Sequence, residues 1–139
     1  MGTVSPKGPL TLFGVAGRAM SAQLVRMNAA ASNLANAGTV ATSDAGAYRP
    51  LRPVFAEELD RKSGLATVKV QGVFRADVGA VRTHDPDHPM ADANGDVWSA
   101  PVDESAEMVE MTEASRQYQN MVEALQTAKQ LMLDTMRMK

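Results

Sequence analysis

The sequence contains no cysteine and few aromatic residues. None of its 139 residues is cysteine, and Phe, Trp and Tyr together make up 4%. The chain therefore forms no disulfide and has no thiolate that could act as a nucleophile or bind a metal, and its redox compartment stays open. Few aromatic residues argue against a deep aromatic ligand pocket. The chain has ten methionines instead, and methionine is typical of adaptable helix packing.

Long apolar runs and an excess of positive charge are also missing. No stretch approaches the roughly 18–20 apolar residues that a membrane span requires, so we expect no direct membrane span. The formal net charge is −2, with acidic and basic residues mixed along the chain. General nucleic-acid binding needs clustered Lys and Arg, so nucleic acid is not an expected partner. Residues 10–17 only weakly resemble a signal-peptide core, and we expect no cleaved signal.

Apolar and small residues recur at alternating spacings of three and four at both ends of the chain. The N-terminal set is Phe13, Gly17, Met20, Leu24, Met27, Ala31 and Leu34. The C-terminal set is Met111, Ala114, Tyr118, Met121, Leu125, Ala128 and Met132. A sustained repeat of about 3.5 residues is typical of helices that wind around other helices. We predict helices over 9–37 and 102–139, paired as a coiled coil, after a flexible tail over 1–8.

Local signals mark where these helices begin and end. Pro9 suits a first helical turn, and Gly38 suits the position just past a helix, where a positive φ is common. Asp103 is a good N-cap for the last helix. From 103 to 138 that helix would be about 54 Å long, whereas a compact chain of this size is under about 40 Å across. The helix therefore either breaks or makes the molecule elongated.

The middle of the chain, residues 38–101, reads as turns and short strands. Residues 38–53 are predicted to form an extended loop, and 54–59 fit either a short helix or a strand. Residues 66–75 alternate apolar and polar side chains, which is typical of a half-buried strand. Further short strands are predicted near Val78 and Val81 and at Val97 and Trp98. The fold class that follows is α+β, with two long terminal helices and a small β-rich central lobe.

Two acidic turns are the only segments that suggest metal ligands. His84 and His88 are four residues apart, but in a proline-rich turn this spacing does not place them on one helical face. Residues 92–96 partly resemble a calcium loop, yet Gly95 stands at position four rather than six, and Asp103 occupies position twelve in place of Glu. We interpret both segments as solvated turns. No catalytic constellation is readable, so we expect no metal, no cofactor and no enzyme.

The apolar stripes have two compatible interpretations. They could form a two-helix core within one subunit, or an interface between many copies. Gly14 and Gly17 would be explained by close helix approach. Leu12, Val15 and Val25 lie off the N-terminal stripe. In the C-terminal stripe Val122 and Leu131 widen the set, and Met108 and Met136 extend it. These positions favour two apolar faces, so both interpretations can hold together.

The most specific string in the chain is Ala-Ser-Asn-Leu-Ala-Asn-Ala-Gly-Thr at residues 31–39. Asn33 and Asn36 project from one side of the last helical turns, and a helix C-cap explains Asn36 and Gly38 but not the whole string. The string resembles a motif of the rod and hook family of bacterial flagellar axial proteins. Residues 20–27, just before the string, also look like this family's helix. Further segments resemble proximal rod proteins of the C type: 48–50 with Phe55, 85–89 with Ala91 and Asp92, Val97, 107–111, 113–118 and 127–129.

The resemblance implies a structural subunit of the flagellar basal-body rod, a hollow shaft that crosses the periplasm, transmits torque and conducts exported subunits. It implies type III export without a cleaved signal. The implied partners are copies of the chain, other proximal and distal rod proteins, the rod-base adaptor and the membrane-ring and export-gate region. The implied assembly interface comprises Phe13, Met20, Leu24, Met27, Asn33, Leu34, Asn36, Thr39, Met111, Tyr118, Met121, Leu125 and Met132.

Two other protein classes remain alternatives at this point. A helical export chaperone or adaptor of a secretion system would also carry amphipathic helices, but it would bind its partners as a soluble dimer and would not need the β-rich middle. A small calcium-binding or hydrolytic domain is the enzyme-class alternative, and tight stoichiometric metal binding would favour it.

Overall fold

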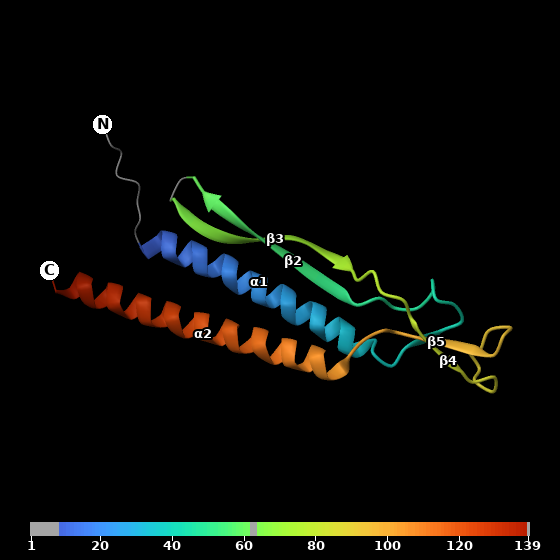
Figure 1. The fold of residues 1–139 in the computed structure, drawn as a ribbon. Helices are drawn as coiled ribbons and strands as arrows, with labels where there is room; N and C mark the ends of the chain where they lie inside the picture. Colours follow the sequence, from blue (N-terminus) through green and yellow to red (C-terminus); the bar gives the residue numbers. More distant parts are fainter. Residues whose placement is uncertain (1–8, 62–63, 139) are drawn as a thin grey trace.

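A computed structural model describes residues 9–61 and 64–138 as an elongated α+β protein (Figure 1). The predicted tail over residues 1–8 lies outside the described residues. The elements in chain order are α1 (Pro9–Ala35), β1 (Val40–Ala41), β2 (Leu51–Asp60), β3 (Leu65–Arg75), β4 (Val81–His84), β5 (Asp96–Ser99) and α2 (Glu104–Arg137). The predicted fold class, α+β with a helix at each end and strands between them, is confirmed.

The two helices lie side by side and run in opposite directions (Figure 1). α2 is a single helix of 34 residues, which corresponds to about 51 Å at roughly 1.5 Å per residue. It does not break, so of the two outcomes that its length allowed, the elongated molecule is the observed one. The far end of the molecule, beyond the start of α2, is formed by the strands and turns between the helices.

α2 begins where the sequence predicted. Asp103 is the N-cap, and its side-chain Oδ1 accepts a hydrogen bond from the backbone N–H of Ala106 at 3.3 Å. Glu104 and Glu107 follow in the first turn and Arg137 stands in the last. Negative charge at the start and positive charge at the end complement the helix dipole.

α1 ends differently from the prediction. Gly38 does not adopt a positive φ; among the described glycines only Gly64 and Gly95 do. The chain instead closes through successive tight turns, with the N–H of Ala37 donating to the carbonyl of Leu34 and the N–H of Thr39 to that of Asn36. Because these turns and the Asn36 side chain, which donates to the Ser32 carbonyl at 2.8 Å, use the last carbonyls, no left-handed residue is needed.

The strands form two separate antiparallel sheets. β2 and β3 make a long hairpin with a bulge between Val54 and Phe55, while β1, β5 and β4 form a small sheet in that order. The segment 54–59, left open from the sequence, is strand. The extended loop predicted for 38–53 is wrong at 40–41 and from Leu51 onward, where backbone pairing with partners distant in sequence makes strands. Val78 lies outside β4.

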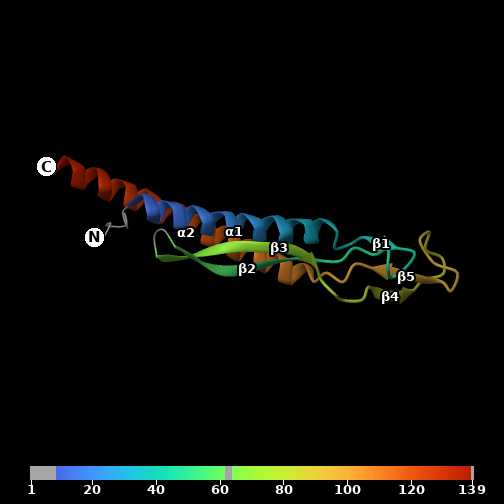
Figure 2. The ribbon, with the colours of Figure 1, turned by 90° about the horizontal axis from the view of Figure 1, so that it is seen from above.

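α1 lies between the hairpin and α2, and it contacts both (Figures 1 and 2). The buried apolar side chains at its two contacts are small: Ala22, Ala29 and Ala30 on α1, and Ala114 on α2. Alanine lets neighbouring backbones approach closely, which suits a thin, layered molecule.

The close helix approach predicted at Gly14 and Gly17 is wrong within the subunit. A Cβ placed on either glycine would meet no atom within 4 Å. The physical reason is that the small residues at the tight contact are the alanines further along α1, not these glycines.

Candidate functional site

The end of α1 is tied to the start of β2 by one buried amide. Asn33 is 0% exposed. Its Nδ2 donates to the carbonyl of Leu51 at 3.1 Å, and its Oδ1 accepts from the N–H of Leu51 at 2.8 Å. The same oxygen accepts from the Tyr48 hydroxyl at 2.8 Å, and that hydroxyl is 3.0 Å from Ser32 Oγ. The Asn33 side chain thus pairs with Leu51 as a neighbouring strand would.

This amide explains most of the 31–39 string. Asn33 anchors the chain after the loop, and Asn36 closes the helix. The Thr39 hydroxyl donates to the Asn36 carbonyl at 2.7 Å. Tyr48 and the fully buried Pro50 complete the anchor from the other side. The string therefore fixes where the chain leaves α1 and where the hairpin begins.

Two ion pairs join α2 to the other elements. Arg26 Nε on α1 donates to Glu110 Oε1 at 2.7 Å, and Arg52 Nη1 on β2 donates to Glu107 Oε1 at 2.6 Å. The hydrogen bond from Arg26 lowers the pKa of Glu110 below its ordinary value, and the same bond raises the pKa of Arg26. The three elements meet at this point, which we call the junction.

A cavity of about 330 Å³ opens at the junction. Arg26 and Ala29 line it from α1, Arg52 from β2, and Glu107 and Glu110 from α2. The Glu107 side chain is 3% exposed, and its Oε2 has no hydrogen-bond partner among the described residues. A buried carboxylate oxygen without a donor is costly for the stability of the fold.

The predicted interface residues on α2 share one partly buried face. Met111, Tyr118, Met121, Leu125 and Met132 are all half-buried. Ala114, within the same repeat, is fully buried. Because α1 is the helix that packs along α2, this face is the one that α2 turns toward α1.

The predicted interface residues on α1 divide between buried and open positions. Phe13, Met20, Met27, Leu34 and Asn36 are half-buried. Asn33 is fully buried inside the subunit, whereas Leu24 is 42% exposed and Thr39 is exposed.

The most buried face of α1 was missed in part. It carries Ala22, Ala29, Ala30 and Asn33, which is a helical spacing but not an apolar signal strong enough to separate from the neighbouring Met and Leu stripe.

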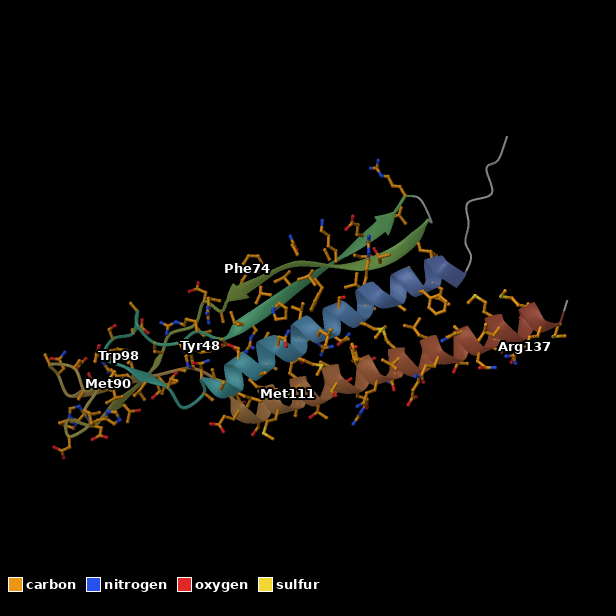
Figure 3. The ribbon with its side chains drawn as sticks, turned by 180° about the vertical axis from the view of Figure 1, so that it is seen from behind. Tyr48, Phe74, Met90, Trp98, Met111 and Arg137 are labelled. Carbon is orange, nitrogen blue, oxygen red and sulfur yellow. The ribbon has the colours of Figure 1, made fainter. Side chains whose placement is uncertain are left out.

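Large apolar side chains remain exposed on α2 at both of its ends. Near the start these are Met108 and Val109, near the end they are Leu131 and Met136, and Met138, the C-cap just after α2, is exposed as well. Figure 3 shows Met111 near one end of α2 and Arg137 at the other. A single subunit thus leaves apolar surface uncovered at positions far apart along its axis, which is typical of a surface that another protein covers.

The far end of the molecule shows no sign of metal chemistry. Asp92 accepts hydrogen bonds at Oδ1 from the N–H groups of Asn94 and Asp96, and the bond from Asp96 is the main cause of its lowered pKa. His84 Nδ1 lies 3.1 Å from Asp96 Oδ1. Within residues 9–61 and 64–138 no three His, Asp or Glu side chains gather as a metal site would require. The carboxylate of Asp92 instead closes its own turn.

Neither of the two helices, over the residues that the structure describes, combines the length and the apolar character needed to cross a bilayer.

Comparison with known proteins gives concordant matches at both ends of the chain. A family model described as "Flagella basal body rod protein" matches residues 13–40, and one described as "Flagellar basal body rod FlgEFG protein C-terminal" matches residues 93–138. Over 129 residues the chain is 43% identical to the flagellar basal-body rod protein FlgC of Salmonella typhimurium, covering 91% of this chain and 95% of the relative. The FlgC proteins of Yersinia enterocolitica and Agrobacterium fabrum are 39% and 36% identical, covering 91% and 87% of this chain and 95% and 88% of the relatives.

Proposed function

The chain belongs to the family of flagellar basal-body rod proteins, and from this premise we propose that its two terminal helices build the wall of the rod and that the strands face outward. The chain is a structural subunit rather than an enzyme. The main support for the proposal is the long α2. One of its faces packs against α1, and large apolar side chains remain exposed near both of its ends.

The terminal helices supply the assembly interface in this proposal. Residues 9–37 and 102–139 form the inner part as a coiled-coil pair, and residues 38–101 form the outer part. The proposed interface side chains are those that the family resemblance implied: Phe13, Met20, Leu24, Met27, Asn33, Leu34, Asn36, Thr39, Met111, Tyr118, Met121, Leu125 and Met132. Leu24, exposed on α1, is the most direct candidate for contact with a neighbouring subunit. Asn33 acts from within, because it holds the outer part to the helix that makes the contact.

The proposed mechanism is mechanical. Subunits related head to tail by a rotation that does not close build a helical array. Burial of apolar surface between them contributes roughly 25 cal/mol per Å² and stiffens the tube. Within each subunit, the ion pairs at the junction and the Asn33 anchor join α1, α2 and the hairpin, so torque applied to the helices also turns the outer part. The hollow centre conducts exported subunits.

The proposed partners are copies of the chain and the other proximal and distal rod proteins, together with the rod-base adaptor and the membrane-ring and export-gate region. The proposed place is the basal body, where the rod crosses the periplasm. The proposed route is type III export without a cleaved signal.

Electron microscopy of purified basal bodies tests the proposal. In a strain lacking the chain, we expect basal bodies without a complete rod, and complementation with the chain should restore the rod and swimming. Complete rods in the deletion strain would contradict the proposed function.

A further inference from the structure

The small sheet at the far end of the molecule stands apart from the other elements (Figures 1 and 2). Among the described residues, no Cα atom of β1, β4 or β5 lies within 8 Å of a Cα atom of α1, α2, β2 or β3. We call this sheet, together with the turns between β4 and β5, the tip lobe; it comprises residues 40–41 and 81–99. Because no other helix or strand packs against the tip lobe, its orientation depends on the segments that connect it to the rest of the subunit.

Four connecting segments join the tip lobe to the helices and the hairpin: 36–39, 42–50, 76–80 and 100–103. Backbone hydrogen bonds hold these segments in pairs. The N–H of Ala100 donates to the carbonyl of Thr39 at 3.1 Å, and the N–H of Ala76, directly after β3, donates to the carbonyl of Pro50 at 2.8 Å. Short segments of this kind can absorb the changes in φ and ψ of a hinge, so a further contact is needed to fix one angle.

One carboxylate joins two of the connecting segments directly beside the tip lobe. Asp44 Oδ1 accepts from the N–H of Ala80 at 2.8 Å, and Ala80 immediately precedes β4. The same oxygen accepts from Arg49 Nη2 at 2.8 Å, and this nitrogen also donates to the Asp44 carbonyl at 2.9 Å. The bond from Ala80 is the main cause that holds the pKa of Asp44 below its ordinary value, so these donors favour the charged carboxylate.

Arg49 carries this contact across to the hairpin. Its carbonyl accepts from Nη1 of Arg75, the last residue of β3, at 2.9 Å. Its neighbour Tyr48 donates through the hydroxyl to Asn33 on α1. The Arg49 side chain is only 21% exposed, so it is largely enclosed by the segments that it joins. Arg49 is thus tied to the hairpin by its backbone and to Asp44, beside the tip lobe, by its guanidinium.

We propose that Arg49 and Asp44 form a brace that fixes the angle of the tip lobe relative to the helices and the hairpin. Without the brace, the tip lobe turns about the four connecting segments while its own strands stay paired. The brace gives Arg49 a role in the Tyr-Arg-Pro string at 48–50 that differs from the anchoring of its two neighbours. This inference concerns the single subunit, so it goes beyond the proposed function and does not depend on it.

Distance measurements between spin labels on the full chain test the brace. The chain has no cysteine, so labels attach only to introduced ones. Ala93→Cys in the tip lobe and Gln71→Cys on β3 are both at exposed positions, and double electron–electron resonance gives the distribution of the distance between the two labels. A second pair, Gln71→Cys with Gln119→Cys at an exposed position of α2, reports whether the hairpin and the helices keep their own arrangement.

A charge-matched pair of variants provides the comparison. Asp44→Ala removes the acceptor of both Ala80 and Arg49, whereas Asp77→Ala removes the same charge from an exposed position in the segment 76–80. We expect a narrow distribution to the tip lobe in the unaltered chain and with Asp77→Ala, and a broader, shifted one with Asp44→Ala, while the second label pair stays unchanged. A broad distribution in the unaltered chain, or the same distribution in both variants, would overturn the proposal.

Trp98 shows whether the tip lobe itself stays folded. It is the only tryptophan of the chain and lies on β5, so its fluorescence maximum should be the same in Asp44→Ala as in the unaltered chain. If the maximum shifts to the red because the tip lobe unfolds, Arg49→Met decides, since it leaves the bond from Ala80 to Asp44 in place. Arg49→Met should then broaden the distribution to the tip lobe, and an unchanged distribution would overturn the proposal.

Discussion

Asn33 pairs with both backbone groups of Leu51: its Nδ2 donates to the Leu51 carbonyl, and its Oδ1 accepts from the Leu51 N–H. The two residues are 18 positions apart. A helix side chain thereby takes the place of a neighbouring strand at the first residue of β2. No other side chain among the described residues bonds both backbone groups of Leu51, and further along the hairpin Arg18 Nη1 on α1 donates to Thr67 Oγ1 on β3 at 3.1 Å.

Asn33→Asp should destabilise the subunit. The carboxylate keeps the acceptor for the Leu51 N–H but loses the donor to the Leu51 carbonyl, leaving two oxygens facing each other in a buried place. We expect a loss of about 1–3 kcal/mol in the free energy of unfolding, measured by urea denaturation. Asn28→Asp, at an exposed position on the same helix, is the control and should change stability little. Equal effects would mean that Asn33 is not the anchor.

Ala114→Leu should separate the two helices. Ala114 is 0% exposed on the face of α2 that packs along α1, so a larger side chain has no space there. Overpacking of this kind costs about 1–3 kcal/mol. Ala124→Leu adds the same atoms at an exposed position of α2 and should be neutral. Urea denaturation of both variants checks the difference, and a neutral Ala114→Leu would contradict the close contact.

The ion pair of Arg26 and Glu110 should make stability depend on pH on the acid side. The hydrogen bond from Arg26 holds the pKa of Glu110 below its ordinary value of 4.5. A carboxyl with a lowered pKa contributes its stabilisation fully above the ordinary value, and this contribution is lost as the pH falls through the lowered one.

Arg26→Met removes that bond and gives the measurable difference. Because the Glu110 side chain is 44% exposed, we expect the variant to be only about 0.2–1 kcal/mol less stable at pH 7. The gap to the unaltered chain should shrink as the pH falls below 4.5, followed by urea unfolding at several pH values. A gap that stays constant down to pH 3 would show that packing, not charge, is lost.

Leu24→Asp should block rod assembly without unfolding the subunit. Leu24 is 42% exposed on α1 within the proposed interface, so a charge there meets water in the free subunit and an apolar neighbour in the rod. The control is Leu59→Asp, at a residue of β2 that is 63% exposed. Swimming and the amount of chain in purified basal bodies should fall for the first variant only. Equal loss would contradict the assignment of the interface to the helices.

The prediction succeeded where neighbouring residues decide the structure. Asp103 caps α2 through an N–H only three residues away. A strand does cover 66–75, but its alternation did not predict burial, because the polar Thr67 is its buried residue and the apolar Val68 and Phe74 are exposed. Gly38 and the glycines at 14 and 17 were misread, because each was given a role by residue type alone. Whether a glycine takes a positive φ or touches a neighbouring helix depends on the rest of the structure.

Periodicity and caps, which act within a few residues, were enough to predict the two terminal helices and their approximate length. The elongated shape followed only from the structure, because a broken last helix was equally compatible with the sequence. The tertiary structure alone decided that Asn33 anchors Leu51 and that Arg52 meets Glu107, 55 residues away. It also selected the alanine face of α1 as the most buried one. The physical reason is that hydrogen bonds and close packing between distant segments depend on where the folded chain brings them, which no local pattern encodes.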